Sequence, residues 1–232
     1  MCFNIEENAI FIADAHFNEQ RGEFFKILEK LKTKEITTTQ LFLMGDMFDF
    51  ITQESYYFIK QNQKVIDLLN ELSCGMQIVY LEGNHDYNLE KLFPNITIIS
   101  RDNQPIRGLY KTQKVALSHG DNFDKFSYNL YCKIIRNRPL LRFLNAIDFN
   151  HWLSKKIDAF LKVKNICHLF NNFEELAQRR VKNYQEDIVI EGHFHQGKEY
   201  LCGNQLYVNI PSLFCSKEYV QLNNGTFNTI KF

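Results

Sequence analysis

Residues 77–86 read QIVYLEGNHD, a run of apolar residues that ends in a Gly-Asn-His-Asp cluster. An apolar run of this length that stops at turn-forming and polar residues predicts a buried strand leading into a functional loop. Apolar residues at helical spacing in 19–31 and 57–72 predict helices between such strands, which indicates a βαβ core. Similar runs that end in polar clusters lie at residues 9–13, 41–44, 114–117 and 187–190.

The last part of the chain predicts further strands. Short runs with alternating polarity lie at 206–210, 218–222 and 226–230, and Asn223 to Gly225 supplies a hairpin turn. We therefore expect an α/β fold in which a second sheet is built largely from these late strands.

Residues 122–187 differ from the rest of the chain. Their pattern predicts helices throughout, with one break at Asn137-Arg138-Pro139. They carry 12 Lys or Arg against 7 acidic residues, whereas the remainder carries 15 against 20, so a basic segment is inserted in an acidic body. We expect a single domain, residues 1–232, with residues 122–187 as a helical lid.

Composition excludes several protein classes. Hydrophobic residues make up 45% and charged residues 23%, and 27 basic residues balance 27 acidic ones, which is typical of a globular protein. No apolar run approaches the roughly 20 residues that span a bilayer, and the first residues do not resemble a signal peptide, so we expect a cytoplasmic protein. The cysteines form no C-x-x-C pair, which favours reduced thiols over a disulfide framework or a zinc ribbon. They are Cys2, Cys74, Cys132, Cys167, Cys202 and Cys215.

Polar clusters follow five of the expected strands. Because strand ends in an α/β sheet meet at one crevice, clusters far apart in sequence can converge. A lone histidine at a strand end is usually a hydrogen-bonded polar residue, and a lone Gly-Asp pair is usually a turn. The evidence for a functional site therefore comes from the five clusters together. Imidazole, carboxylate and one amide oxygen together suit Mn²⁺, Zn²⁺ or Fe²⁺, and the lack of cysteine argues against structural zinc. The clusters are Asp14-Ala15-His16, Gly45 to Asp49, Gly83 to Asp86, Ser118 to Asp121 and Gly192 to His195.

These clusters match the order D-x-H, G-D-x-x-D, G-N-H-D/E, H and G-H-x-H, so the chain resembles the calcineurin-like metallophosphoesterases. The resemblance implies a two-sheet αββα sandwich and hydrolysis by two divalent cations, with Mn²⁺ expected. It implies that Asp14, His16 and His195 hold the first metal. It assigns Asn84, His119 and His193 to the second metal and Asp46 to both. His85 would act on the phosphate, with Asp49 and Asp86 as supporting catalytic residues.

The lid carries an apolar stripe interrupted by lysines, a pattern typical of a basic helix at a membrane surface. The alternative is a helix packed on the domain with its lysines in water. We predict that the stripe and nearby arginines bind substrate: Trp152, Leu153, Ile157, Phe160 and Leu161, with Arg136, Arg138 and Arg142.

In length and pattern the lid resembles one branch of the family, the UDP-2,3-diacylglucosamine pyrophosphatases of lipid A biosynthesis, although well-known members have Arg in place of His85. The resemblance implies a lipid-linked nucleotide substrate and possible contact with the inner face of the membrane. Another phosphodiesterase, acting on nucleotides or nucleic acid, is the first alternative, although we do not expect a nucleic-acid partner. A scaffold without catalysis is the second, but every expected ligand is present. No obligate protein partner is evident.

Overall fold

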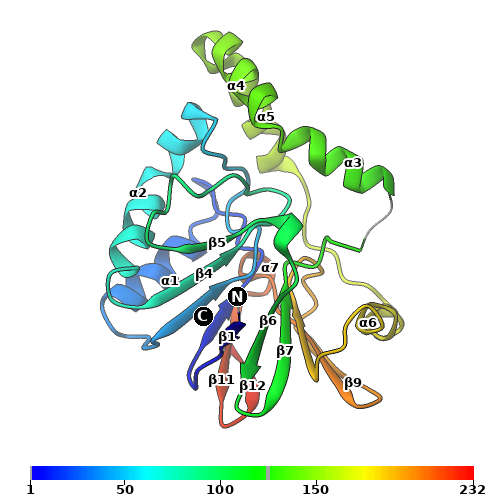
Figure 1. Ribbon diagram of the computed structural model, residues 1–232. Helices are drawn as coiled ribbons and strands as arrows, with labels where there is room; N and C mark the ends of the chain where they lie inside the picture. The colour runs from blue at the N-terminus through cyan, green and yellow to red at the C-terminus, as the bar shows by residue number, and fades with distance from the viewer. Residues whose placement is uncertain (1, 124–125) are drawn as a thin grey trace.

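The computed structural model describes residues 2–123 and 126–232, in which two six-stranded sheets pack face to face (Figure 1). Lys125, counted in the charge of the lid, lies outside the described residues. One sheet has the order β12-β11-β2-β3-β4-β5, and the other has the order β1-β6-β7-β8-β10-β9. Helices cover the outer faces, which confirms the αββα sandwich.

The first sheet contains the three strands expected early in the chain. Its parallel strands are β2 (Ile10–Ile12), β3 (Gln40–Leu43), β4 (Gln77–Leu81) and β5 (Thr97–Ile99). The hairpin of β11 (Glu218–Asn223) and β12 (Thr226–Lys231), closed at Asn224-Gly225 as the sequence predicts, adds to β2 in antiparallel orientation.

The second sheet corrects the expectation that late strands build it. It consists of β1 (Cys2–Asn4), β6 (Ile106–Tyr110), β7 (Gln113–Ser118), β8 (Ile188–Glu191), β9 (Lys198–Cys202) and β10 (Gln205–Asn209). Two of the three late runs instead extend the first sheet. These runs join the first sheet because β11 hydrogen-bonds to β2, and no local pattern in the sequence indicates this long-range pairing.

Alternating side chains divide the core into layers, because successive residues of a strand point to opposite faces. Phe11, Phe42 and Val79 point between the sheets, whereas their neighbours point toward α1 (Glu23–Lys32) and α2 (Tyr56–Leu72). On the other side of the sandwich, Ala116 and Val189 pack under α6 (Phe173–Val181). These buried layers hold the strands that end at the polar clusters.

The lid region contains α3 (Phe126–Ile135), α4 (Arg138–Ile147) and α5 (Trp152–Val163), which stand beyond the strand ends at the top of Figure 1. The break before α4 occurs as predicted, with Asn137 accepting a hydrogen bond from the Leu140 amide. Residues 164–172 are not helical, contrary to the prediction of helices throughout. They cross from α5 to α6, which covers the sandwich itself.

A disulfide joins Cys167 to Cys215, so the expectation that the cysteines are reduced thiols is wrong for this pair. Cys167 lies in the crossing segment and Cys215 in the short helix α7 (Leu213–Ser216). The two residues are 48 positions apart in the chain and lack any spacing motif, so only the fold brings them together.

Among the described residues, no helix is both long and apolar enough to span a bilayer.

Candidate metal centre

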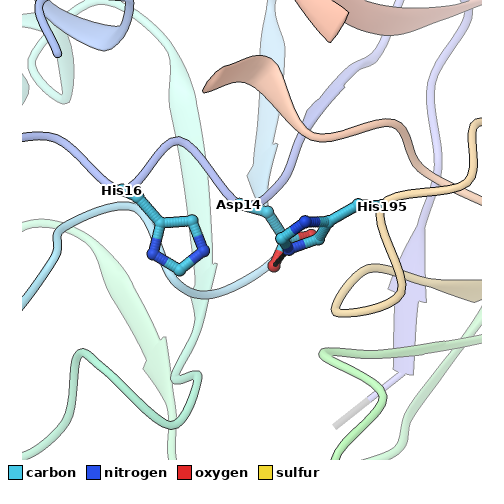
Figure 2. Close-up of side chains that lie close together, drawn as sticks. All are labelled: Asp14, His16 and His195. Atoms are coloured by element: carbon cyan, nitrogen blue, oxygen red, sulfur yellow. Dashed lines mark ion pairs between the residues drawn. The ribbon is translucent and has the colours of Figure 1, made fainter. Parts of the chain in front are cut away.

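The first ligand cluster lies at the end of β2, where Asp14, His16 and His195 approach one another (Figure 2). The His195 Nε2 atom is 3.3 Å from Asp14 Oδ1. Both ring nitrogens of His16 and Asp14 Oδ1 are buried without a hydrogen-bond partner. Because buried polar atoms are almost always paired, Asp14 Oδ1 and one ring nitrogen of His16 fit a cation beside His195, since one potential ligand atom of each residue lies within 4.8 Å of the others.

The second cluster is centred on His119, which follows β7. Its Nδ1 lies 2.8 Å from the Met44 carbonyl oxygen, which can only accept, so Nδ1 donates and Nε2 faces the site. That Nε2 lies 3.2 Å from His193 Nδ1, 3.3 Å from Asn84 Oδ1 and 3.7 Å from Asp46 Oδ2. Four potential ligand atoms thus converge, two nitrogens and two oxygens, as a borderline dication prefers.

Asp46 stands between the two clusters. Its carboxylate lies close to the imidazoles of His119 and His193 on one side and to those of His16 and His85 on the other. One carboxylate between two imidazole sets is the arrangement needed to bridge two cations. The donor set therefore fits two divalent metals, although it does not select which ones.

The loops that carry these ligands adopt a backbone conformation that ordinary residues rarely adopt. A positive φ is found at five of the predicted ligands: Asp14, His16, Asp46, His193 and His195. A left-handed conformation at a non-glycine residue is costly, and such residues concentrate at functional sites where the surrounding fold enforces them.

Gly83 is required by the close approach of two loops. A Cβ atom at this position would lie 2.2 Å from Asp46 Oδ1 and 2.5 Å from the Asp46 backbone nitrogen. Gly45, at φ +93°, similarly leaves room for the His119 ring. The glycines of the G-N-H-D and G-D-x-x-D motifs thus let the carboxylate and imidazole ligands come together.

Burial sets the protonation of two imidazoles. It lowers the pKa of His16 well below its usual value, and the neighbouring His85 lowers it further. Burial and His119 lower the pKa of His193 in the same way. For His119 itself, burial is outweighed by the attraction of Asp46, which raises the pKa to about 9. A metal must displace that proton, so its affinity should fall as the pH falls.

His85 lines the cavity between the ligand clusters, and its own ring is held by the chain. Its Nδ1 lies 2.6 Å from the Asp49 carbonyl oxygen and therefore donates to it. The ring meets that of His16 edge-on, with centroids 5.0 Å apart. The His85 ring also lies near His16 and Asp46, with one potential ligand atom of each residue within 4.8 Å of the others.

The two supporting carboxylates have different surroundings. Asp86 is fully buried and accepts hydrogen bonds from the backbone amides of Asp46, Met47 and Gly83 and from the Tyr80 hydroxyl. It therefore joins the G-D-x-x-D loop to the G-N-H-D loop.

Asp49 pairs with Arg21 at 2.6 Å and accepts a hydrogen bond from Asn18. Asn18 and Arg21 were not predicted from the sequence, because they precede an ordinary amphipathic helix and match no motif.

The cavity over the ligands has a volume of about 170 Å³. One wall is made by the segment that follows α5, through Lys164, Asn165, Ile166 and His168. No sequence motif indicates this wall, and the pattern of residues 164–168 predicted a helix.

The three predicted substrate-binding arginines contact the body of the protein. Arg136 donates to the Gly83 carbonyl oxygen at 2.5 Å, and Arg138 pairs with Glu90 at 2.7 Å. Arg142 lies 3.9 Å from the Glu54 carboxylate. Arg136, which lies between α3 and α4, thus contacts the loop that carries Asn84 and His85, whereas Arg138 and Arg142 tie α4 to neighbouring loops.

The predicted apolar stripe of α5 is divided between two environments. Leu153 and Ile157 line a cavity of about 60 Å³ shared with Phe50 and Phe58. Trp152 and Phe160 point outward with 50% and 66% of their surface exposed, while Leu161 is partly buried.

The model of the calcineurin-like phosphoesterase family matches residues 8–197. The chain belongs to this family. Metal-dependent phosphoester hydrolysis, the activity expected from the sequence, is thereby confirmed. Among solved structures, the YfcE phosphoesterase from E. coli is similar in fold, with a TM-score of 0.52 at 17% identity over 97% of this chain and 92% of that one.

Curated relatives point to one branch of the family. A UDP-2,3-diacylglucosamine hydrolase of Wigglesworthia glossinidia brevipalpis is 22% identical over 97% of this chain and 94% of its own length. The enzyme of the same name from Histophilus somni strain 129Pt is 24% identical over 82% and 85% respectively. This identity fits a divergent member of the branch.

Proposed function

We propose that this chain uses two divalent cations to hydrolyse UDP-2,3-diacylglucosamine to UMP and 2,3-diacylglucosamine 1-phosphate in lipid A biosynthesis. The observation that carries the proposal is the position of two ligand clusters, with Asp46 near His16 of the first and His119 of the second, beside helices with many exposed apolar side chains. The relatives named for this substrate, matched over most of their length, support it.

The first cation would be held by Asp14, His16 and His195, the second by Asn84, His119 and His193, with Asp46 on both. Bound there, the cations would activate water and polarise the phosphoryl oxygens, so no protein nucleophile is needed. Mn²⁺ is the ion we propose, because the resemblance to the family implies it and a mixed set of imidazole and carboxylate donors accommodates it.

His85 supplies the proton in this proposal. Its Nδ1 is committed to the Asp49 carbonyl oxygen, so the ring can exchange a proton with substrate only through Nε2. When both nitrogens are protonated, Nε2 can donate to the leaving oxygen or to a charged phosphoryl oxygen. Asp49 and Asp86 contribute by holding the loops in place.

The helices α3 to α5 would receive the acyl chains. Exposed large apolar side chains concentrate there, including Phe126, Phe143 and Phe160, each with more than half of its surface exposed. Exposed apolar side chains gathered on neighbouring helices indicate a binding surface. Lysines interleaved with it would allow the protein to work in the cytoplasm against the inner face of the membrane.

The test is hydrolysis of UDP-2,3-diacylglucosamine in mixed micelles, beside a chromogenic phosphodiester and single-stranded DNA, each with Mn²⁺ and with chelator. We expect the lipid nucleotide to be cleaved fastest, with detergent required and with no activity after chelation. Activity that survives exhaustive chelation would refute the metal assignment.

The alternative is a phosphodiesterase for nucleotides or nucleic acid, favoured by the basic character of the lid. It predicts that DNA or a soluble nucleotide is preferred and that detergent makes no difference. The same set of assays therefore separates the two substrates.

A further inference from the structure

The wall of the metal cavity formed by residues 164–168, here called the strap, is irregular chain lying directly over the ligands. Such a segment has no helix or sheet to fix it, so its position depends on particular contacts. One of these contacts comes from a residue that is far away in sequence and has no assigned role.

Arg21 is that residue. Only 7% of its surface is exposed, although arginine is rarely buried unless it is paired. Its Nη2 donates to the carbonyl oxygens of Lys162 and Lys164, at 3.2 and 3.4 Å. Its guanidinium also stacks on Phe214, 4.5 Å from the ring centroid. Arg21 therefore binds the end of α5 and the first residue of the strap.

The other side of the guanidinium reaches the metal centre. Nη1 donates to Asp49 Oδ1 at 2.6 Å, and the same carboxylate oxygen lies 3.7 Å from His16 Nδ1. The backbone carbonyl oxygen of Asp49 accepts the hydrogen bond from His85 at 2.6 Å. A single residue, Asp49, thus contacts a predicted metal ligand and the predicted proton donor.

We propose that Arg21 is a positioning residue that holds the strap over the cavity and, through Asp49, aligns His16 and His85. It links the lid to the chemistry, because its side chain contacts both the strap and Asp49. The inference rests on hydrolysis at this site and does not depend on which phosphoester is cleaved.

The role requires the shape of arginine as well as its charge. A guanidinium presents five donors in a planar fork, and here the fork serves one carboxylate and two carbonyl groups. Lysine would keep a positive charge beside Asp49 but could not reach all three acceptors in the same geometry. Arg21→Lys should therefore be intermediate between the wild type and Arg21→Gln.

The experiment compares Arg21→Lys and Arg21→Gln with Arg107→Gln as the matched control. Arg107 lies on β6 and also pairs with a carboxylate, that of Glu186, but its side chain is 63% exposed and is not in the metal cavity. Three quantities are measured for each folded variant: kcat and KM on bis(p-nitrophenyl) phosphate with Mn²⁺, Mn²⁺ bound per chain, and amide hydrogen exchange of a peptide that covers residues 164–168.

We expect Arg21→Gln to lower kcat by roughly 10- to 100-fold, as expected when an outer partner of a metal site is lost. Exchange of the strap should rise while exchange of the strands is unchanged, and KM for this small substrate should change little. Arg107→Gln should match the wild type in all three measurements.

The proposal is overturned if folded Arg21→Gln keeps wild-type kcat, whether or not the strap exchanges faster. It is also overturned if exchange rises throughout the molecule, because that shows a purely structural role. If Arg21→Gln does not fold, Arg21→Lys carries the test, and wild-type behaviour in it refutes the need for the fork. If the wild type hydrolyses none of the substrates, the proposed function is contradicted. Amide hydrogen exchange of the strap in the Arg21 variants would still show whether Arg21 holds it.

Discussion

The ligand loops and the lid differ in which side chains they bury. In the loops, polar side chains are buried: Asp14 and His119 expose none of their surface, and the backbone at several ligands is left-handed. In the lid, apolar side chains are exposed, as at Phe126 and Phe160 with 82% and 66% of their surface accessible. Burying a carboxylate and exposing an aromatic patch are each unfavourable for an isolated chain. Both arrangements are expected where a region binds a ligand, and we propose a cation for the loops and an apolar ligand for the lid.

The largest effect should follow from changing the residue shared by both clusters. Asp46→Asn removes a negative charge between two cations, so both should bind more weakly and repel each other more. We expect activity to fall by more than the roughly 10²–10³-fold that losing one acid or oxyanion partner costs, because both cations are affected. Metal equivalents per chain, measured after gel filtration, report the cause. Asp67→Asn, an exposed site on α2, is the control, and two metals bound to Asp46→Asn with normal affinity would contradict the bridging role.

A smaller effect should follow at His85, which faces the cavity without belonging to either proposed ligand set. His85→Ala should reduce kcat by about 10²–10³-fold, the usual result of losing one acid or oxyanion partner. Metal content should remain that of the wild type, as measured by atomic absorption. Loss of metal from this variant would make His85 a ligand.

The lid should behave differently from the loops. Changing Leu153, Ile157, Phe160 and Leu161 to polar residues should raise KM for the acylated substrate and leave a small phosphodiester unaffected. Each buried methylene contributes about 0.8 kcal/mol, so lost contact with two of them raises KM roughly tenfold. The control is Leu201→Gln, an apolar residue on β9 with 77% of its surface exposed. Equal damage to both substrates would show that the stripe is structural.

The smallest effect on catalysis should come from the disulfide that joins the strap to α7. Replacing Cys167 and Cys215 by serine frees the strap at one point, but Arg21 and Gln196, which donates to the His168 carbonyl oxygen at 3.1 Å, still hold it. We expect kcat to change by less than about tenfold.

Stability should change more. Closing a loop of 48 residues is worth up to about 4 kcal/mol in the unfolded chain, so Tm should fall by several degrees in a thermal melt. Cys74→Ser, at an exposed free thiol, is the control. An unchanged Tm would mean that the bridge contributes no stability.

The sequence predicted the ligand clusters because each motif is local. Gly83, Asn84 and His85 follow an apolar strand directly, and strand ends converge in this class of fold. The βαβ core could be predicted from local patterns too, whereas the αββα layers followed from the resemblance to the family. The split of the late strands between the sheets could not, because pairing with β2 is a long-range choice.

What the sequence alone determined is therefore the set of chemical groups at the site and the order of the strands that present them. Tertiary structure alone decided how those groups are held: the pairing of Arg21 with Asp49, the strap over the cavity and the bond between Cys167 and Cys215. The physical reason is how far apart in the sequence the interacting residues lie. A motif is encoded by neighbours in the chain, whereas a buried ion pair or a tether forms between residues that only folding brings together.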